Sequence, residues 1–143
     1  MMTVHRILRS KGAGALTIDP DSMVLTALEV MADHDVGALV VVEGGEVIGM
    51  FSERDYARKV VLLGRSSKDL PVRDIMSPDF YPVSQEDTVE ECMELMTRWR
   101  VRHLPVMEDG NLIGLVSMGD VVKALVSDQR FTIEQLEHYI TAG

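Results

Sequence analysis

The sequence of 143 residues is poor in cysteine and has no long hydrophobic run. Its single cysteine, Cys92, excludes an internal disulfide framework and a zinc site built from several cysteines. The longest apolar stretches, such as Ala38–Val42, are far shorter than the roughly 20 residues that a membrane-spanning helix requires. No basic segment followed by an apolar one opens the chain, as a secretion leader would. We therefore expect a cytoplasmic protein without a membrane span.

Basic residues are also scarce. Lysine and arginine together number 14, against 23 aspartate and glutamate residues, which gives a formal net charge of −9. Such a chain repels nucleic acid and anionic membrane surfaces at long range, so neither is an expected partner. An anionic ligand must instead be held by a local cluster of cations or by backbone N–H groups.

The remaining composition is that of a folded domain. Hydrophobic residues make up 46% and charged residues 26% of the chain, and no low-complexity tract is present. This length suits one compact unit, or two small lobes that share a core.

The chain contains an internal repeat. A constant shift of 65 residues places Thr17–Val60 over Pro82–Leu125 without a gap. Upstream, Val4–Leu8 resembles Val72–Met76 at a slightly different shift. We interpret the chain as two copies of one unit. The identical pairs include Val24/Val89, Glu29/Glu94, Met31/Met96, Val36/Val101, Leu39/Leu104, Val41/Val106, Glu43/Glu108, Gly45/Gly110, Ile48/Ile113, Gly49/Gly114, Ser52/Ser117 and Asp55/Asp120.

Each copy predicts the order strand, helix, strand, strand, helix. Apolar residues at helical spacing predict a helix after Ser22 and another after Asp87, the two expected N-caps. A second helix is expected from Ser52 and from Ser117, and a last one over 131–140 that covers a core or a partner subunit. The predicted strands are 15–18, 38–42 and 47–51 in the first copy and 80–83, 104–107 and 112–116 in the second.

These elements predict an α+β fold. Each unit is too small to bury a three-stranded sheet alone, so we expect two β-α-β-β-α repeats packed sheet to sheet about a pseudo-twofold axis. That arrangement leaves two equivalent clefts between the copies. The expected boundaries are 1–66 for the first repeat with an N-terminal helix, 67–127 for the second repeat and 128–143 for a helical tail, with 61–71 as an exposed connector.

The pattern Gly-x-x-Ser-x-x-Asp occurs at 49–55 and again at 114–120. It places a hydroxyl and a carboxylate three residues apart at a helix start. A carboxylate there can accept hydrogen bonds from the two hydroxyls of a ribose. The same residues can also form a plain helix cap, and duplication does not decide between the two interpretations.

The densest cation cluster precedes the strand at 104–107. It comprises Arg98, Arg100, Arg102 and His103. Charge-assisted bonds of such groups to phosphate are strong, and for Arg102 we favour a binding role. Arg98 and Arg100 are interpreted as solvating the end of a helix, and His103 fits a core role equally well.

Other candidate sites are excluded. Cys92 aligns with Ala27 on a buried helix face and is expected to pack as a small hydrophobe. Trp99 and the ten methionines are interpreted as packing residues, and the four histidines lack metal-ligand spacing. No nucleophile, base and oxyanion stabiliser come together, so we expect neither a metal nor an enzyme.

Together these motifs resemble a tandem pair of CBS (cystathionine-β-synthase-type) domains, over nearly the whole chain. The resemblance rests on the twin motifs, the acidic helix openings, the strand Val36–Val42 and the run Arg102–Val106. The length is similar to that of stand-alone bacterial members. The resemblance implies binding of AMP, ADP, ATP, NAD or S-adenosylmethionine between the repeats, and a face-to-face homodimer with up to four sites.

The resemblance also implies roles for individual residues. Asp55 and Asp120 would hold ribose hydroxyls, with Ser52 and Ser117 beside them. The phosphate arm would come from the opposite repeat. For the Asp55 cleft it is Arg102 and His103; for the Asp120 cleft the equivalents, Gly37 and Ala38, carry no charge. Strand-entry residues Ala15, Thr17, Phe80 and Tyr81 would border the adenine, and Lys11 and Arg54 would supplement the phosphate contacts.

We therefore expect a non-enzymatic sensor for an adenosine nucleotide whose bound state is read by an unknown regulated protein. The Asp55 cleft should bind phosphorylated ligands more tightly than the Asp120 cleft. One alternative is a structural dimerisation scaffold with degenerate, empty clefts, and another is an enzyme acting on a nucleotide. The sequence leaves open which nucleotide binds and whether magnesium accompanies it.

Overall fold

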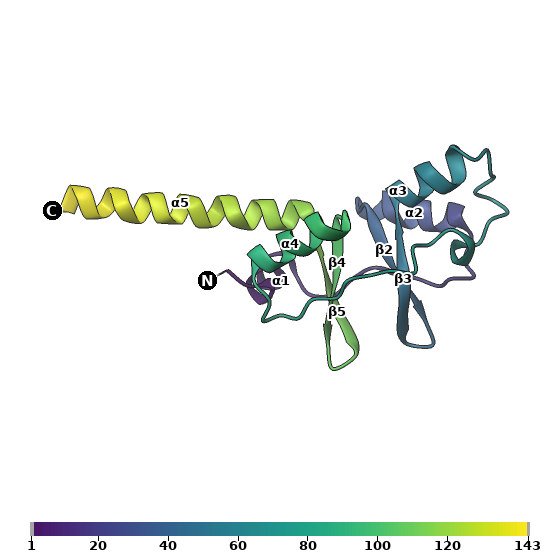
Figure 1. Cartoon of the computed structure of the whole chain (residues 1–143), viewed down its shortest axis with the longest axis horizontal. Helices are drawn as coiled ribbons and strands as arrows, with labels where there is room; N and C mark the ends of the chain where they lie inside the picture. Colours follow the sequence, from purple (N-terminus) through teal and green to yellow (C-terminus); the bar gives the residue numbers. More distant parts are fainter. Residues whose placement is uncertain (1, 143) are drawn as a thin grey trace.

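The computed structural model describes residues 2–142, excepting the side chains at 139, 141 and 142. Two sheets lie side by side, each with helices on its outer side (Figure 1). This confirms the predicted α+β repeat architecture. The first repeat holds β1 (Thr17–Ile18), α2 (Val24–His34), β2 (Ala38–Glu43), β3 (Glu46–Ser52) and α3 (Glu53–Tyr56), followed by a π-helical turn, Ala57–Val61. The second holds α4 (Val89–Trp99), β4 (His103–Glu108), β5 (Asn111–Ser117) and the start of α5 (Met118–Ala142).

The hairpins β2–β3 and β4–β5 have the same pairing register. Ala38 pairs with Ser52 in the first hairpin, and His103 pairs with Ser117 at the equivalent place in the second. Both hairpins carry an irregularity at the same position, between Val41 and Val42 and between 106 and 107. The 65-residue repeat therefore extends to individual backbone pairs.

Two-residue turns close both hairpins, as the glycine-containing sequences predict. Gly44 and Gly45 have φ values of 58° and 81°, and Asp109 and Gly110 have φ values of 51° and 80°. Two successive residues with positive φ match the right-handed twist of the flanking strands, and glycine adopts this conformation without a steric penalty.

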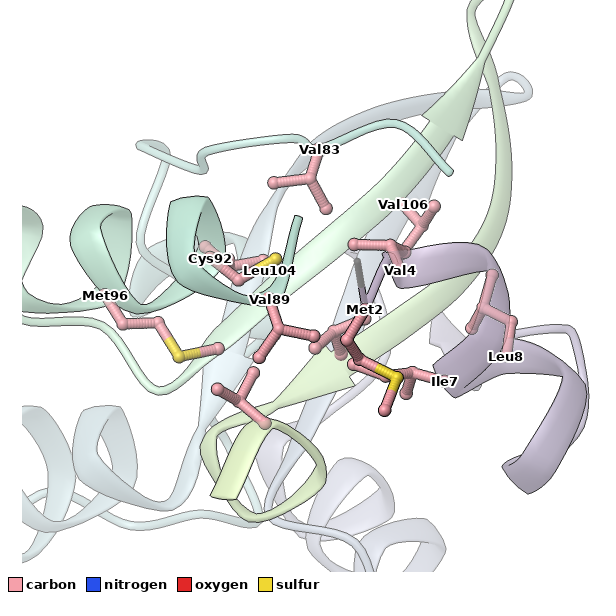
Figure 2. Packing of buried hydrophobic residues seen from close by; sticks show 12 residues of the cluster. Met2, Val4, Ile7, Leu8, Val83, Val89, Cys92, Met96, Leu104 and Val106 are labelled. Carbon is pink, nitrogen blue, oxygen red and sulfur yellow. The ribbon is translucent and has the colours of Figure 1, made fainter. Parts of the chain in front are cut away.

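The segment before each repeat packs against the other repeat. Helix α1 (Val4–Lys11) buries Val4, Ile7 and Leu8 in the core formed by α4, β4 and β5 (Figure 2). The 3-10 turn Val72–Asp74 lies correspondingly in the core of the first repeat. Equivalent backbone bonds fix both segments, because the Val89 amide donates to the Met2 carbonyl at 3.0 Å as the Val24 amide donates to Leu70 at 2.8 Å.

A third apolar cluster joins the two sheets. Ala38, Val40 and Met50 of the first sheet are buried, and Leu112 and Leu115 of β5 pack against them. The sheets thus contact each other through side chains, as predicted. This contact places the ends of β2 and β3 beside the residues that enter β4.

Two local predictions were wrong. The expected strand at 80–83 is reduced to a single parallel bridge between Val83 and Val106, and the expected strand at 15–18 to Thr17–Ile18. The N-caps lie one residue later than predicted. Thr88 caps α4 by accepting a bond from the Glu91 amide at 3.1 Å, and Met23 occupies the cap position of α2 without a side-chain bond.

The predicted tail helix continues α5 without a break, and α5 extends away from the rest of the molecule (Figure 1). The start of α5 packs on the core of the second repeat through Val121, but the apolar residues of the tail part, from 131 on, are exposed and do not cover a core of this chain. Tyr139, also predicted there, has its side chain outside the described residues. The exposed set is Phe131, Ile133, Leu136 and Ile140. Among residues 2–142, no helix combines the length and the hydropathy needed to cross a bilayer.

Candidate ligand-binding cleft

A cavity of about 320 Å³ lies between the two repeats. Its walls are the start of β2, the β3–α3 junction, the segment 77–81 and the junction between α4 and β4. It brings together these predicted ligand residues: Gly37, Ala38, Ser52, Arg54, Asp55, Phe80, Tyr81, Arg102 and His103. Gly37 and Ala38, which the sequence assigned to the Asp120 cleft, line this cavity instead. Lys11, Ala15, Thr17, Ser117 and Asp120 lie outside its lining.

Asp55 is the buried carboxylate of the cavity, with 7% of its surface exposed. Its Oδ2 atom accepts bonds from the Ser52 amide at 3.0 Å and the Ser52 hydroxyl at 3.1 Å, while the Asp55 amide donates to Ser52 Oγ at 3.3 Å. Oδ1 accepts from the Ser77 hydroxyl at 2.9 Å and pairs with Lys59 at 3.2 Å. The capping interpretation of the motif is therefore confirmed. Three hydrogen bonds and one ion pair therefore hold the Asp55 carboxylate.

Gly49, the first residue of the motif, is required by close backbone approach. A Cβ atom at this position would lie 2.5 Å from the Ser77 carbonyl oxygen. The closeness lets the Met50 amide donate to Ser77 at 2.9 Å and the Ser77 amide donate to Met50 at 2.8 Å. The glycine thus seats segment 77–81 on β3 and brings the Ser77 hydroxyl to Asp55.

The cation cluster lines the opposite wall. Arg100, Arg102 and His103 reach the cavity from the second repeat, and Arg54 reaches it from the first. Arg54 Nη1 donates to the Arg100 carbonyl at 2.7 Å, so one side chain joins α3 to the end of α4. Arg98 lies outside the cavity lining and pairs with Glu94 at 3.2 Å, which fits its interpretation as a surface residue.

The cavity also contains acidic and aromatic groups. Glu53 and Asp79 belong to its lining, so the arginines do not act alone on a ligand. Tyr81 stacks on Trp99, with ring centroids 4.8 Å apart and planes inclined by 8°. Trp99 lies outside the cavity lining, and the structure shows the predicted packing role for it.

His103 is held in its neutral form by its surroundings. Burial lowers its pKa, and the charges of Lys11 and Arg102 lower it further, whereas Asp120 acts in the opposite direction. The ring lies close to Gly37, because a Cβ atom there would be 3.6 Å from Nε2. His103 therefore faces both the Asp55 cavity and the second motif.

The surroundings of Asp120, where the second cleft is predicted, differ from those of Asp55. The Ser117 amide donates to Asp120 Oδ2 at 2.9 Å, and the Asp120 amide donates to Ser117 Oγ at 3.1 Å, so the cap is repeated. Lys11 Nζ, from the end of α1, donates to Asp120 Oδ2 at 2.8 Å and to the Leu115 carbonyl at 2.9 Å. Burial alone would raise the pKa of Asp120, but Lys11 and the Ser117 amide outweigh it and lower the pKa below its usual value.

Cys92 is fully buried, as its alignment with Ala27 predicts. Burial, with smaller contributions from Asp87 and Glu91, raises the pKa of its thiol to about 11. The protonated thiol is a poor nucleophile at neutral pH. Within residues 2–142, no group of histidine, cysteine and carboxylate side chains is arranged to hold a metal ion.

Sequence reasoning missed several residues of the cavity. Arg100 was assigned to the surface, yet it lines the cavity because its left-handed conformation, with φ at 55°, turns the chain at the end of α4. Ser77 and Asp79 lie in an irregular segment that carries no motif. The other missed lining residues are Met50, Glu53 and Val101.

The sequence profile of the CBS domain matches residues 13–62 and 72–127. CBS domain-containing protein CBSX3, mitochondrial, of Arabidopsis thaliana is 43% identical over 150 residues, which span 99% of this chain and 73% of that protein. A solved structure from Burkholderia ambifaria MC40-6, a protein with CBS domains assigned provisionally to signal transduction, is 45% identical, with a TM-score of 0.85 and coverage of 90% of this chain and 96% of its own.

A more distant solved structure shares the fold. It is the CBS domain pair of protein MJ0100 in complex with 5′-methylthioadenosine and S-adenosyl-L-methionine, with 18% identity, a TM-score of 0.79, and coverage of 90% of this chain and 98% of its own. The profile matches both repeats, and the close relatives extend over nearly the whole chain. This chain belongs to the CBS domain family and carries two CBS domains.

Proposed function

We propose that this chain is a non-enzymatic regulatory module that binds a phosphorylated adenosine compound, such as AMP, ADP, ATP or NAD, in the Asp55 cavity. The observation that carries the proposal is the composition of that one cavity. A buried carboxylate, two aromatic residues and three arginines line it together. In the distant relative MJ0100 the CBS domain pair holds two adenosine compounds.

Each group suits one part of such a ligand. Phe80 and Tyr81 offer apolar surface to the adenine, and Asp55 with Ser52 offers acceptors to the ribose hydroxyls. Arg102 and His103 are donors for the phosphate. A ribose hydroxyl would take the place of the Ser77 hydroxyl on Asp55 Oδ1, because that hydroxyl is a neutral donor on a rotatable bond.

The bond from Arg54 to Arg100 offers a way to transmit binding. It joins the two repeats across the cavity through a neutral carbonyl acceptor. A phosphate is a stronger acceptor for a guanidinium group than a carbonyl is. A bound nucleotide would therefore draw Arg54 away from the end of α4, and the altered relation between the repeats is what an unidentified regulated protein would read.

We further propose that the chain acts as a homodimer. Val61, Leu62 and Leu63 follow α3 with more than half of their surface exposed, at 55%, 76% and 66%. Val122 and Val126, on the equivalent helix of the second repeat, are exposed by 52% and 41%. Exposed apolar residues at equivalent places in the two repeats are typical of an interface between copies. The cytoplasm is the compartment that this proposal assumes.

Calorimetric titration and thermal shift with AMP, ADP, ATP, NAD and adenosine test the proposed ligand class. A compound present at 100 times its Kd should stabilise the protein by about 2.7 kcal/mol. Asp55→Asn should abolish binding, and Arg102→Ala should weaken AMP binding while sparing adenosine. Asp33→Asn, an exposed change on α2, is the matched control and should leave binding unchanged. Binding of AMP that is insensitive to Asp55→Asn and Arg102→Ala would refute the assignment.

One observation favours the alternative of a structural scaffold. The carboxylates of both motifs are already satisfied by partners within the chain. If the scaffold is correct, no adenosine compound stabilises the protein, and the dimer persists in their absence. The titration series therefore decides between the two functions.

A further inference from the structure

The two motifs are related by the repeat, but different segments contact them. The first cleft is the Asp55 cavity, and the second is the cleft predicted around Asp120. In the first cleft, Ser77 donates twice, from its amide to the Met50 carbonyl at 2.8 Å and from its hydroxyl to Asp55 at 2.9 Å. In the second cleft, Lys11 Nζ donates to the Leu115 carbonyl at 2.9 Å and to Asp120 at 2.8 Å. Leu115 is the repeat equivalent of Met50, so one ammonium group makes both bonds that Ser77 makes in the first cleft.

We propose that Lys11 is a built-in occupant of the Asp120 cleft and restricts the chain to one nucleotide, held at Asp55. This inference rests on the proposed function and deepens it, because it names what decides which cleft is open. A neutral hydroxyl can be exchanged for a ribose hydroxyl at little cost. An ammonium group paired to a carboxylate gives stronger, charge-assisted bonds, and a neutral sugar hydroxyl is a poor replacement for it.

The position of Lys11 is fixed in advance by the fold. It is the last residue of α1, whose residues Val4, Ile7 and Leu8 are buried in the core of the second repeat. Leu8 packs directly on Gly114, where a Cβ atom would lie 2.7 Å from Leu8 Cδ2. Because the helix is anchored, holding its final side chain over Asp120 costs little further conformational entropy.

Lys59, the lysine beside Asp55, does not play the same part. It follows Asp55 by four residues on the same helical segment and also donates to the Ile75 carbonyl at 3.1 Å. It is absent from the lining of the cavity, whereas Ser77 belongs to that lining. Lys59 therefore pairs with Asp55 from outside the cavity. The donor to Asp55 that belongs to the cavity lining, the Ser77 hydroxyl, is neutral.

The repeat also predicts no phosphate arm for the second cleft, and the residues that it assigns to that arm line the Asp55 cavity instead. The repeat equivalents of Arg102 and His103 are Gly37 and Ala38, which carry no charge. Removing Lys11 should therefore open the Asp120 cleft to an uncharged nucleoside rather than to a nucleotide. Adenosine is the suitable probe for it.

The test is calorimetric stoichiometry of the full-length chain with AMP and with adenosine. The wild type should bind one AMP per chain, and Asp55→Asn should remove it. Lys11→Met should bind a second equivalent of adenosine, and the double change Lys11→Met with Asp120→Asn should lose that equivalent again. Lys123→Met, which removes an exposed lysine from α5, should leave the stoichiometry unchanged.

The outcomes separate this inference from the proposed function. If the wild type binds one AMP at Asp55 and Lys11→Met gains no adenosine equivalent, the proposed function stands and the role of Lys11 is refuted. A wild type that binds two nucleotides, and Lys11→Met only one, would make Lys11 a phosphate ligand instead. If the wild type binds nothing, the proposed function fails, while a single equivalent gained by Lys11→Met still supports the inference and no gain overturns it.

A second measurement covers the case in which Lys11→Met folds poorly. Lys11→Ser supplies a neutral hydroxyl like that of Ser77 and should also gain the adenosine equivalent. Carbon-detected NMR titration should show the pKa of Asp120 rising in both variants, since the ammonium group is gone. A lysine with a merely structural role would change stability in these variants without changing the number of ligands bound.

Discussion

Gly49→Ala should destabilise the protein more than Gly114→Ala, although both glycines open the same motif. At Gly49 the new methyl group would lie 2.5 Å from the Ser77 carbonyl oxygen, which is backbone. At Gly114 it would lie 2.7 Å from a methyl group of Leu8, which is the end of a flexible side chain. Neither glycine has a positive φ, so the substitutions differ only in what they displace.

The magnitudes follow from those two obstacles. Gly49→Ala must push segment 77–81 off β3 and lose the paired bonds between Met50 and Ser77, at a cost of about 2–3 kcal/mol. Gly114→Ala needs only a shifted Leu8 rotamer, at about 1 kcal/mol. The loss of unfolded-state entropy on replacing glycine by alanine is common to both and does not affect the difference.

Urea unfolding of both variants measures the difference directly, and thermal unfolding should show a loss of about 6–9 °C for Gly49→Ala against about 3 °C for Gly114→Ala. Gly49→Ala should also weaken AMP binding, because it displaces Phe80 and Tyr81, which line the cavity. Equal losses of stability in the two variants would refute the reasoning. They would mean that the backbone at Ser77 moves aside as easily as the side chain of Leu8.

Three further outcomes are expected. Because the pKa of His103 is lowered in the folded protein, the unfolded chain binds more protons near pH 6.5, and the free energy of unfolding should fall as the pH drops through this value. In urea unfolding measured from pH 7.5 to 5.5, His103→Gln should reduce this dependence of stability on pH. Ile133, Leu136 and Ile140 are exposed on α5 at coiled-coil spacing, so the double change Ile133→Glu and Leu136→Glu should shift the proposed homodimer toward monomer in sedimentation equilibrium, whereas Gln135→Glu should not. Thr88→Ala should cost about 1 kcal/mol in urea unfolding, because it removes the observed cap of α4.

The repeat made most of the sheet architecture predictable. Because the strands and turns of one copy had to serve for the other, the hairpins and their glycine turns could be placed with little error. The tail was harder. The tail was expected as a separate helix over 131–140, yet α5 runs from Met118 to Ala142 without a break.

Which core an amphipathic segment covers could not be predicted. The periodicity of α1 shows that one face is apolar, but it carries no information on the identity of the partner surface. The structure places that face on the second repeat. For the same reason Ser77 was missed, since its role depends on a backbone contact with Gly49 that local sequence does not encode.

The residues that the two copies share explain the scaffold, and those that they do not share explain the asymmetry. Gly49 and Gly114 both admit a crossing segment, and both aspartates cap a helix. These features are needed for folding in either copy, so their duplication alone says little about ligands. The segments that cross over the glycines come from outside the aligned copies and have diverged to a serine hydroxyl in one cleft and a lysine ammonium in the other. Differences in ligand binding between the clefts should therefore depend on these crossing segments. Placing lysine at 77 and serine at 11 should change which cleft binds a ligand more than any substitution of Gly49 or Gly114 does.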